Sequence, residues 1–195
     1  MKNVYKVSDF LLPEELDRIN HILTDDESWG LRSQSKEDPA LGRLMFTIFF
    51  PDGMLDSIRV RVENLIGRSL PLMNGMFVTY QAKYGQPNLP PHFDGDNNDL
   101  IIDYQYKSNT SWGLGVDTTV YDMKDNDAII FNPNEYPHWR PHKTFKDDEF
   151  VTMIFFRFPD EENVDYSHMR YSQDHEIFSE ARKVRDSLKS EGMAE

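Results

Sequence analysis

The sequence predicts a mainly β fold, a jelly roll or closed barrel, with helices at both ends of the chain. Five segments between residues 76 and 158 are short, rich in β-branched or aromatic residues, and separated by Gly, Pro, Asn or Asp. They are MFVTYQAKY, DLIIDYQYK, TTVYDM, DAIIFNP and EFVTMIFFRF. Many short strands in succession are typical of jelly rolls and barrels. Segments with helical spacing precede and follow this block, so we expect an α+β arrangement in which helices support a β core.

The N-terminal third of the chain predicts one short strand, two helices and a second strand. VYKV has strand character, and Pro13 suits the first turn of the helix that follows it. The polar segment 26–42 predicts a loop, and LMFTIFF after it predicts a strand. MLDSIRVRVENLIG repeats apolar residues at helical spacing and ends at Gly67, a helix-stopping residue. The tail segment YSQDHEIFSEARKVRDSLKS predicts a final helix.

The chain of 195 residues has no internal repeat and no low-complexity linker. A length of this size suits one domain with a substantial core. We therefore expect a single domain over 1–195, with N-terminal support to about residue 72, a jelly-roll core over about 73–160 and a helical tail over about 161–195.

The composition excludes several classes of function. A net charge of −13 and a pI near 4.8 argue against nonspecific nucleic-acid binding, which depends on Lys and Arg neutralising phosphates. The absence of cysteine excludes disulfides, thiolate nucleophiles and cysteine-ligated metals. The first residues lack the pattern of a signal peptide, and the longest apolar runs are too short to cross a bilayer. We expect a soluble, cytoplasmic protein.

The segment PPHFDGDNND, from residue 90, concentrates oxygen-bearing side chains beside a histidine and permits two metal hypotheses. A calcium loop that begins at Asp94 requires Gly at its sixth position and Glu at its twelfth. Those positions hold Asp99 and Gln105, and the flanking segments predict strands where a calcium loop of this kind has helices. The calcium hypothesis is therefore the weaker of the two.

The second hypothesis is an iron site. Side chains two residues apart on an extended strand share a face, so His92 and Asp94 can reach one ion. A third ligand must come from another strand, and NEYPHWRPHK offers His138 and His142. Two histidines and one carboxylate leave open coordination positions, as in non-heme Fe(II) oxygenases. A His-x-Asp pair also occurs by chance in surface loops, but the strand-rich surroundings favour the metal site.

The segments VSDFLLPEELDRI, VTYQAKYGQPNLPPHFD, KDNDAIIFNPNEYPHWR and FVTMIFFRF resemble the Fe(II)/2-oxoglutarate-dependent dioxygenases, on the prolyl-hydroxylase-like side of the family. The resemblance extends over most of the chain, to about Phe158. PHWRPH is similar to an HWR-type motif of some members, which selects His138 as the third ligand. The resemblance implies a double-stranded β-helix (a cupin-like jelly roll), with Fe(II) on His92, Asp94 and His138, 2-oxoglutarate and dioxygen as co-substrates, and hydroxylation with release of succinate and CO2.

The chain departs from the family where a basic residue usually pairs with the far carboxylate of 2-oxoglutarate. That region reads FKDDEF, in which Lys146 falls early in a charged run. A buried anion needs a cation or several donors. Arg140 is our first candidate, because on a continuing strand it faces the same side as His138 and its planar guanidinium suits a carboxylate. Arg157, near the end of the last strand, is the second candidate, and Lys83 is a remote third.

Tyrosine hydroxyls are natural donors to a bound keto acid. By the same resemblance, Tyr84 and Tyr106 match tyrosines that line the co-substrate pocket, with Tyr80 and Tyr104 as alternatives by strand parity. Tyrosine on a strand also serves in packing, which stays an open interpretation for each of them.

The resulting hypothesis is an oxygenase that hydroxylates a peptide residue, prolyl or similar, or a small molecule. One alternative keeps the jelly roll as a non-catalytic, cupin-like metal- or ligand-binding protein, and the absence of the usual basic residue supports it. Another alternative is a nucleic-acid demethylating dioxygenase, against which the charge of −13 argues. The substrate itself and the oligomeric state are not determined by the sequence.

Overall fold

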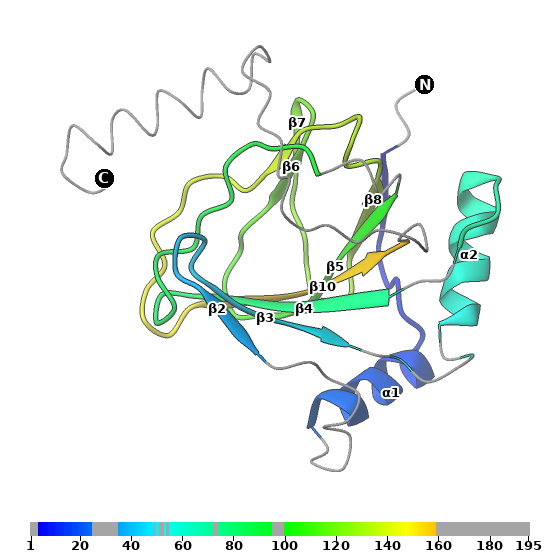
Figure 1. Cartoon of the computed structure of the whole chain (residues 1–195), viewed down its shortest axis with the longest axis horizontal. Helices are drawn as coiled ribbons and strands as arrows, with labels where there is room; N and C mark the ends of the chain where they lie inside the picture. Colours follow the sequence, from blue (N-terminus) through cyan, green and yellow to red (C-terminus); the bar gives the residue numbers. More distant parts are fainter. Residues whose placement is uncertain are drawn as a thin grey trace.

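Two β-sheets face each other, and two helices cover the outer side of the larger sheet (Figure 1). The computed structural model describes residues 4–24, 35–48, 50, 53, 55–71, 74–94 and 100–158. The helices are α1 (Pro13–Thr24) and α2 (Asp56–Ile66). The strands are β1 (Tyr5–Val7), β2 (Lys36–Asp38), β3 (Arg43–Ile48), β4 (Asn74–Gln81), β5 (Ile101–Ser108), β6 (Leu114–Val116), β7 (Thr119–Tyr121), β8 (Ala128–Phe131), β9 (His138–Trp139) and β10 (Phe150–Arg157).

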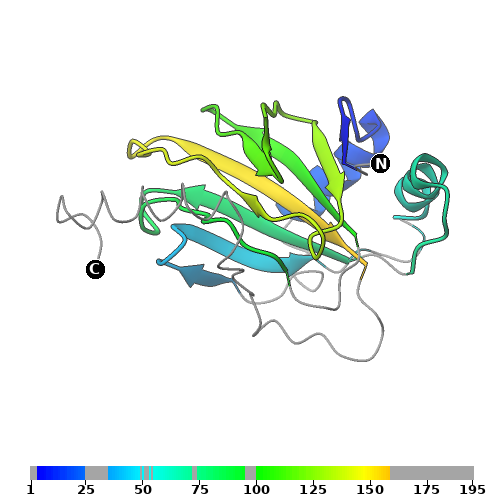
Figure 2. The ribbon, with the colours of Figure 1, turned by 90° about the horizontal axis from the view of Figure 1, so that it is seen from above.

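The larger sheet is antiparallel, with the strand order β1-β8-β5-β10-β4-β3-β2. Figure 2 shows β10, in yellow, lying between the teal β4 and the green β5. The last strand of the chain therefore closes the centre of the sheet, between strands that come much earlier in the sequence. This interleaving of distant strands is the arrangement of a jelly roll.

The smaller sheet has the order β7-β6-β9. An isolated antiparallel β-bridge pairs His92 with His138 of the edge strand β9, so the segment that carries His92 lies beside the smaller sheet. The metal-ligand candidates of two distant segments thus become neighbours through backbone pairing. The observed fold is the mainly β jelly roll with flanking helices that the sequence predicts.

The central strands β5, β8 and β10 of the larger sheet are mostly buried on both faces, and alternate residues of each strand point to opposite sides. Its outer face packs against the helices through residues such as Ile19, Ile58 and Ile102. Its inner face meets the smaller sheet in a second core. That core contains Val78, Tyr80, Ile101, Trp112, Leu114, Val116, Met123, Ile129, Phe131, Phe145, Val151, Met153 and Phe155.

Glu15 joins the two helices. Only 4% of Glu15 is exposed, and its carboxylate accepts hydrogen bonds from Arg61 of α2 at 2.7 and 2.8 Å. It also accepts from the Ser57 hydroxyl at 2.5 Å and from the Leu12 backbone N–H at 2.9 Å. Burial raises the pKa of Glu15, but the bonds to Arg61 and Ser57 outweigh burial and hold that pKa below its usual value.

The structure confirms most of the predicted elements and corrects one. Helix α1 begins at Pro13 and helix α2 ends before Gly67, as expected. Gly67 has the left-handed backbone of a helix C-cap. The segment 26–42 was predicted as a loop, but its residues 36–38 form β2, because they pair with β3. The short strand β6 was not predicted. The strand expected at His138 is β9, but it ends at Trp139, before Arg140. The predicted C-terminal helix lies outside the described residues.

Neither helix of the described residues is long and apolar enough to cross a membrane.

Candidate metal centre

Backbone pairing brings the two histidines together. The His92 N–H donates to the His138 carbonyl at 3.1 Å, and the His138 N–H donates back to the His92 carbonyl at 2.9 Å. The Asp94 N–H donates to the Pro133 carbonyl at 3.1 Å, which fixes the strand end that carries the carboxylate. The site therefore sits on paired backbone segments of the smaller sheet, a rigid support for a ligand set.

The three side chains converge. Asp94 Oδ1 lies 3.6 Å from His92 Nε2 and 3.6 Å from His138 Nε2. One ligand atom from each residue lies within 4.8 Å of the other two, and the imidazole centroids are 4.1 Å apart. Both histidines are buried, with 4% exposed. Two imidazole nitrogens and one carboxylate oxygen at these separations can share a single ion, and they form the 2-His-1-carboxylate donor set suited to Fe(II).

One histidine has its ring orientation fixed by the backbone. His92 Nδ1 lies 2.8 Å from the Pro90 carbonyl, so Nδ1 carries the proton and donates it there. Nε2 is then the lone-pair nitrogen, and Nε2 is the atom that faces Asp94. Metal-binding histidines generally have this second hydrogen bond, which selects the tautomer.

Electrostatics keep all three groups in the form that binds metal. Burial lowers the pKa of His92, and burial together with the neighbouring His92 lowers the pKa of His138 to about 3. Burial would raise the pKa of Asp94, but the interaction of its carboxylate with the His138 ring and the charge of Arg157 outweigh burial and hold that pKa below its usual value. Two neutral imidazoles and a carboxylate are therefore present at neutral pH, without a proton to displace.

Arg140 extends into the barrel interior from the residue after β9. Only 3% of it is exposed, and its backbone N–H donates to the Leu89 carbonyl at 2.9 Å. The guanidinium donates to the Trp112 carbonyl, lies 3.2 Å from Met153 Sδ, and sits 5.0 Å from the centre of the Trp112 ring. Burial lowers the pKa of Arg140, while Tyr80 and Asp103 oppose that effect. A buried cation with this few partners can take a bound anion.

Tyr80 and Arg43 complete the polar interior next to Arg140. Tyr80 is fully buried on the inner face of β4 and pairs in register with Arg43 of β3. Arg43 is bound to Asp38, with Nε and a terminal nitrogen 3.1 and 3.0 Å from one carboxylate oxygen. Burial would lower the pKa of Arg43, but Tyr80 and Asp38 outweigh burial and raise it. The Tyr80 hydroxyl thus lies in a cationic environment suited to a carboxylate.

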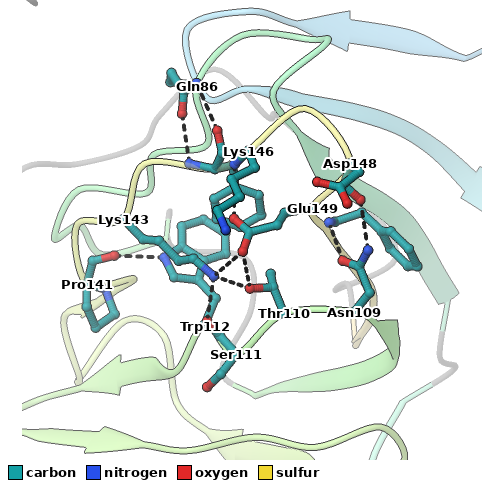
Figure 3. Close-up of polar contacts among 12 residues, drawn as sticks. Gln86, Asn109, Thr110, Ser111, Trp112, Pro141, Lys143, Lys146, Asp148 and Glu149 are labelled. Carbon is teal, nitrogen blue, oxygen red and sulfur yellow. Dashed lines mark hydrogen bonds and ion pairs between the residues drawn. The ribbon is translucent and has the colours of Figure 1, made fainter.

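The connection between β9 and β10 holds the Trp112 ring in place (Figure 3). The Trp112 carbonyl in turn accepts a hydrogen bond from Arg140. Trp112 Nε1 donates to the Pro141 carbonyl at 2.7 Å. Lys143 Nζ donates to the Thr110 hydroxyl and lies 3.4 Å from Glu149. These contacts fasten the two loops that flank the guanidinium.

Two further charged residues, Arg157 and Asp103, lie on the inner faces of their strands. Arg157 shares the inner side of β10 with Met153 and Phe155, and its charge acts on Asp94. Asp103 of β5 is 3% exposed. Burial raises the pKa of Asp103 to about 7, against the opposing charge of Arg140.

Other sequence candidates lie away from this interior. Tyr106 is on the outer face of β5, where its hydroxyl donates to Asn20 of α1 at 2.5 Å, and burial raises its pKa. Tyr84 lies beyond the end of β4, with Lys83 Nζ 4.7 Å from its ring centre. His142 is exposed. Of the predicted co-substrate residues, Arg140 is buried in the interior, Arg157 is on the inner side of β10, and Tyr106 is on the outer face of β5. Tyr84 is half-buried beyond the end of β4.

Sequence reasoning named Tyr80 only as an alternative and missed Arg43 and Asp103. Arg43 follows a polar segment, and this context predicts a surface residue. The available signal was strand parity, since Arg43 and Met45 share the face of β3 that meets the inner core.

The solved structures that resemble this chain include two prolyl hydroxylases. A Pseudomonas putida prolyl-4-hydroxylase matches with a TM-score of 0.53 and 12% identity, covering 82% of this chain and 93% of that one. A prolyl hydroxylase from Trichoplax adhaerens, in complex with a hypoxia inducible factor oxygen degradation domain peptide fragment, matches with a TM-score of 0.55 and 12% identity, covering 82% and 84%. OsALKBH1 matches with a TM-score of 0.51 and 13% identity, covering 80% and 98%.

These similarities show a shared fold. No family model and no curated protein matches the sequence.

Proposed function

We propose that the protein is a non-heme oxygenase that depends on Fe(II) and 2-oxoglutarate. The observation that carries the proposal is the convergence of His92, Asp94 and His138 on one point, with ligand atoms within 4.8 Å of one another. The donor set fits Fe(II) and leaves room for further ligands. The prolyl-hydroxylase fold around it supports the same activity.

The protein's own residues would divide the work between two subsites. His92, Asp94 and His138 would hold Fe(II), already deprotonated and oriented. Arg140 and Tyr80 would bind the far carboxylate of 2-oxoglutarate, in place of the basic residue that the sequence lacks after the distal histidine. When bound, iron and 2-oxoglutarate supply the oxidising chemistry, in which 2-oxoglutarate, dioxygen and substrate give succinate, CO2 and hydroxylated substrate.

For the substrate we propose a peptide residue, prolyl or similar, or a small molecule. One neighbour in fold is a prolyl hydroxylase in complex with a peptide fragment. The net charge of −13 disfavours a polyanionic nucleic acid. The non-catalytic alternative loses its main support, because Arg140 provides a buried cation in the interior.

The test is oxygen-dependent formation of succinate from 2-oxoglutarate by the Fe(II)-loaded protein. Asp94→Ala should abolish both iron binding and succinate formation, while His142→Ala, at an exposed histidine outside the cluster, should leave both at wild-type level. Iron binding and succinate formation that survive in Asp94→Ala would refute the assignment.

A further inference from the structure

The side-chain amide of Gln86 binds both backbone polar groups of Phe145. Its oxygen accepts from the Phe145 N–H at 3.0 Å, and its nitrogen donates to the Phe145 carbonyl at 3.3 Å. The amide thus makes the pair of bonds that a neighbouring antiparallel strand would make. Phe145 lies in the connection between β9 and β10, and only 2% of it is exposed. Gln86 therefore fixes the point at which this connection enters the interior (Figure 3).

The Phe145 ring packs against the aromatic side of the co-substrate subsite. Its centre lies 5.1 Å from that of the Trp112 ring, edge to face, and the Trp112 ring meets the Tyr80 ring in the same way at 5.1 Å. The Arg140 guanidinium lies 5.0 Å from the Trp112 ring centre. Trp112 therefore contacts both groups that are proposed to bind the far carboxylate, and Phe145 packs on Trp112.

The segment that carries Gln86 is a rigid base for this contact. Gly42 and Gly85 have φ values of 60° and 115°, and a Cβ on Gly42 would lie 2.4 Å from the Gly85 carbonyl oxygen. Only a residue without a side chain allows the two backbones to approach so closely. Further along the same segment, the Leu89 carbonyl accepts from the Arg140 N–H at 2.9 Å. Gln86 therefore joins the aromatic side of the subsite to the segment that holds the Arg140 backbone.

We propose that Gln86 is a positioning residue for the co-substrate. Through Phe145 it holds the Trp112 ring, and with it Tyr80 and Arg140, in the arrangement that binds the far carboxylate of 2-oxoglutarate. The proposal rests on the proposed function, in which Arg140 and Tyr80 bind that carboxylate. Loss of the amide frees the backbone of Phe145 to shift, and a shift of about 1 Å in a binding group is enough to weaken its contacts many-fold.

The experiment titrates 2-oxoglutarate anaerobically into Fe(II)-loaded wild type and Gln86→Ala, with the visible band of the iron-chelated keto acid as readout. Gln86→Ala should weaken 2-oxoglutarate binding about tenfold, because two hydrogen bonds that order the connection are lost. The KM for 2-oxoglutarate in succinate formation should rise by the same factor, while kcat stays within about twofold of wild type. Iron affinity should not change, because the ligand segments keep their own backbone pairing.

Hydrogen exchange of the Phe145 amide in the metal-free protein tests the contact itself. The Phe145 N–H loses its acceptor in Gln86→Ala, so it should exchange about tenfold faster than in wild type. Gln86→Glu is a second variant that keeps the length of the side chain. At pH 8 its carboxylate has no hydrogen to donate to the Phe145 carbonyl, so 2-oxoglutarate binding should weaken here as well.

Asn109→Ala is the matched control. Asn109 is also an exposed amide with two bonds to the same connection and the start of β10, since it donates to the Asp148 carbonyl at 2.8 Å and accepts from the Phe150 N–H at 2.8 Å. Figure 3 shows Gln86 and Asn109 binding at separate points. Asn109→Ala should lower the unfolding midpoint as Gln86→Ala does, but leave the affinity for 2-oxoglutarate within about twofold of wild type.

The outcomes separate the two proposals. Wild-type affinity for 2-oxoglutarate in Gln86→Ala, or an equal loss of affinity in Asn109→Ala, would overturn the role of Gln86 and leave the proposed function in place. Unchanged exchange of the Phe145 amide in Gln86→Ala would overturn the contact on which that role depends. Absence of the band in wild type would overturn the proposed function, and this inference with it.

Discussion

Replacing Arg140 with methionine tests the co-substrate subsite most sharply. Methionine keeps a flexible side chain of similar reach and removes the charge and the donors. A charge-assisted hydrogen bond contributes about 1.5–3 kcal/mol, so loss of a contact to a carboxylate should weaken 2-oxoglutarate binding about 10- to 150-fold.

The structure also predicts what this substitution leaves unchanged. The groups that act most strongly on the pKa of Asp94 are His138, Arg157, His92 and Arg43, and Arg140 is not among them. Iron affinity should therefore stay near wild type in Arg140→Met. The Trp112 carbonyl loses its donor, which costs about 1–3 kcal/mol of unfolding free energy, partly offset because a buried charge is removed.

The assay is an anaerobic titration of Fe(II) and then 2-oxoglutarate into wild type, Arg140→Met and Arg59→Met. Arg59, on the surface of α2, pairs with Asp56 and Glu63 and serves as the matched arginine-to-methionine control. Wild-type 2-oxoglutarate affinity in Arg140→Met would refute the assignment and transfer the far carboxylate to Arg43 or Arg157.

Three further predictions follow from named contacts. Arg157→Met removes a positive charge that acts on Asp94, so it should raise the pKa of that carboxylate and weaken Fe(II) binding. Competition with a metal chelator measures the iron affinity, and an unchanged affinity would contradict the prediction. Glu15→Ala removes the carboxylate that Arg61 binds at the joint between the helices and leaves Arg61 only its bond to the Phe10 carbonyl. The free energy of unfolding in urea should fall by about 3 kcal/mol, whereas a loss under about 1 kcal/mol would show that the joint contributes little. In metal-free protein the pKa of His138 is about 3 in the folded state and 6.5 in the unfolded state, so its contribution to stability is complete above pH 6.5 and decreases as the pH falls toward 3. The free energy of unfolding should therefore fall by about 2 kcal/mol between pH 7 and pH 5. His138→Gln should remove that part of the loss.

The sequence predicts the long elements well because their patterns are local. Helix α2 shows apolar spacing and a glycine stop, and β10 is a continuous apolar strand. The strands β6 and β9 have only three and two residues, too few for any periodicity to show. They exist because neighbouring strands pair with them, which is a tertiary effect.

The interior charges were harder to predict than the metal ligands. His92 and Asp94 share a face in any extended segment, so a local rule suffices for them. In β5 the polar Asp103 alternates with Ile102 and Tyr104, a pattern typical of a strand with one face in water. Both faces of this strand are buried here, one against the helices and one inside the barrel. Alternation alone cannot assign the inner face. Tyr106 was expected in the co-substrate pocket from the family resemblance, but its hydroxyl lies on the outer face, where it donates to Asn20.

The most direct test of the account is an anaerobic titration of the wild-type protein. Fe(II) is added to the metal-free protein, and 2-oxoglutarate is then added while the visible absorption is followed. The account predicts a weak charge-transfer band that saturates near one equivalent of iron and is absent in Asp94→Ala. Tight Fe(II) binding at His92, Asp94 and His138 without any band on addition of a 2-oxo acid would contradict it, and would leave a metal-binding jelly roll without this chemistry.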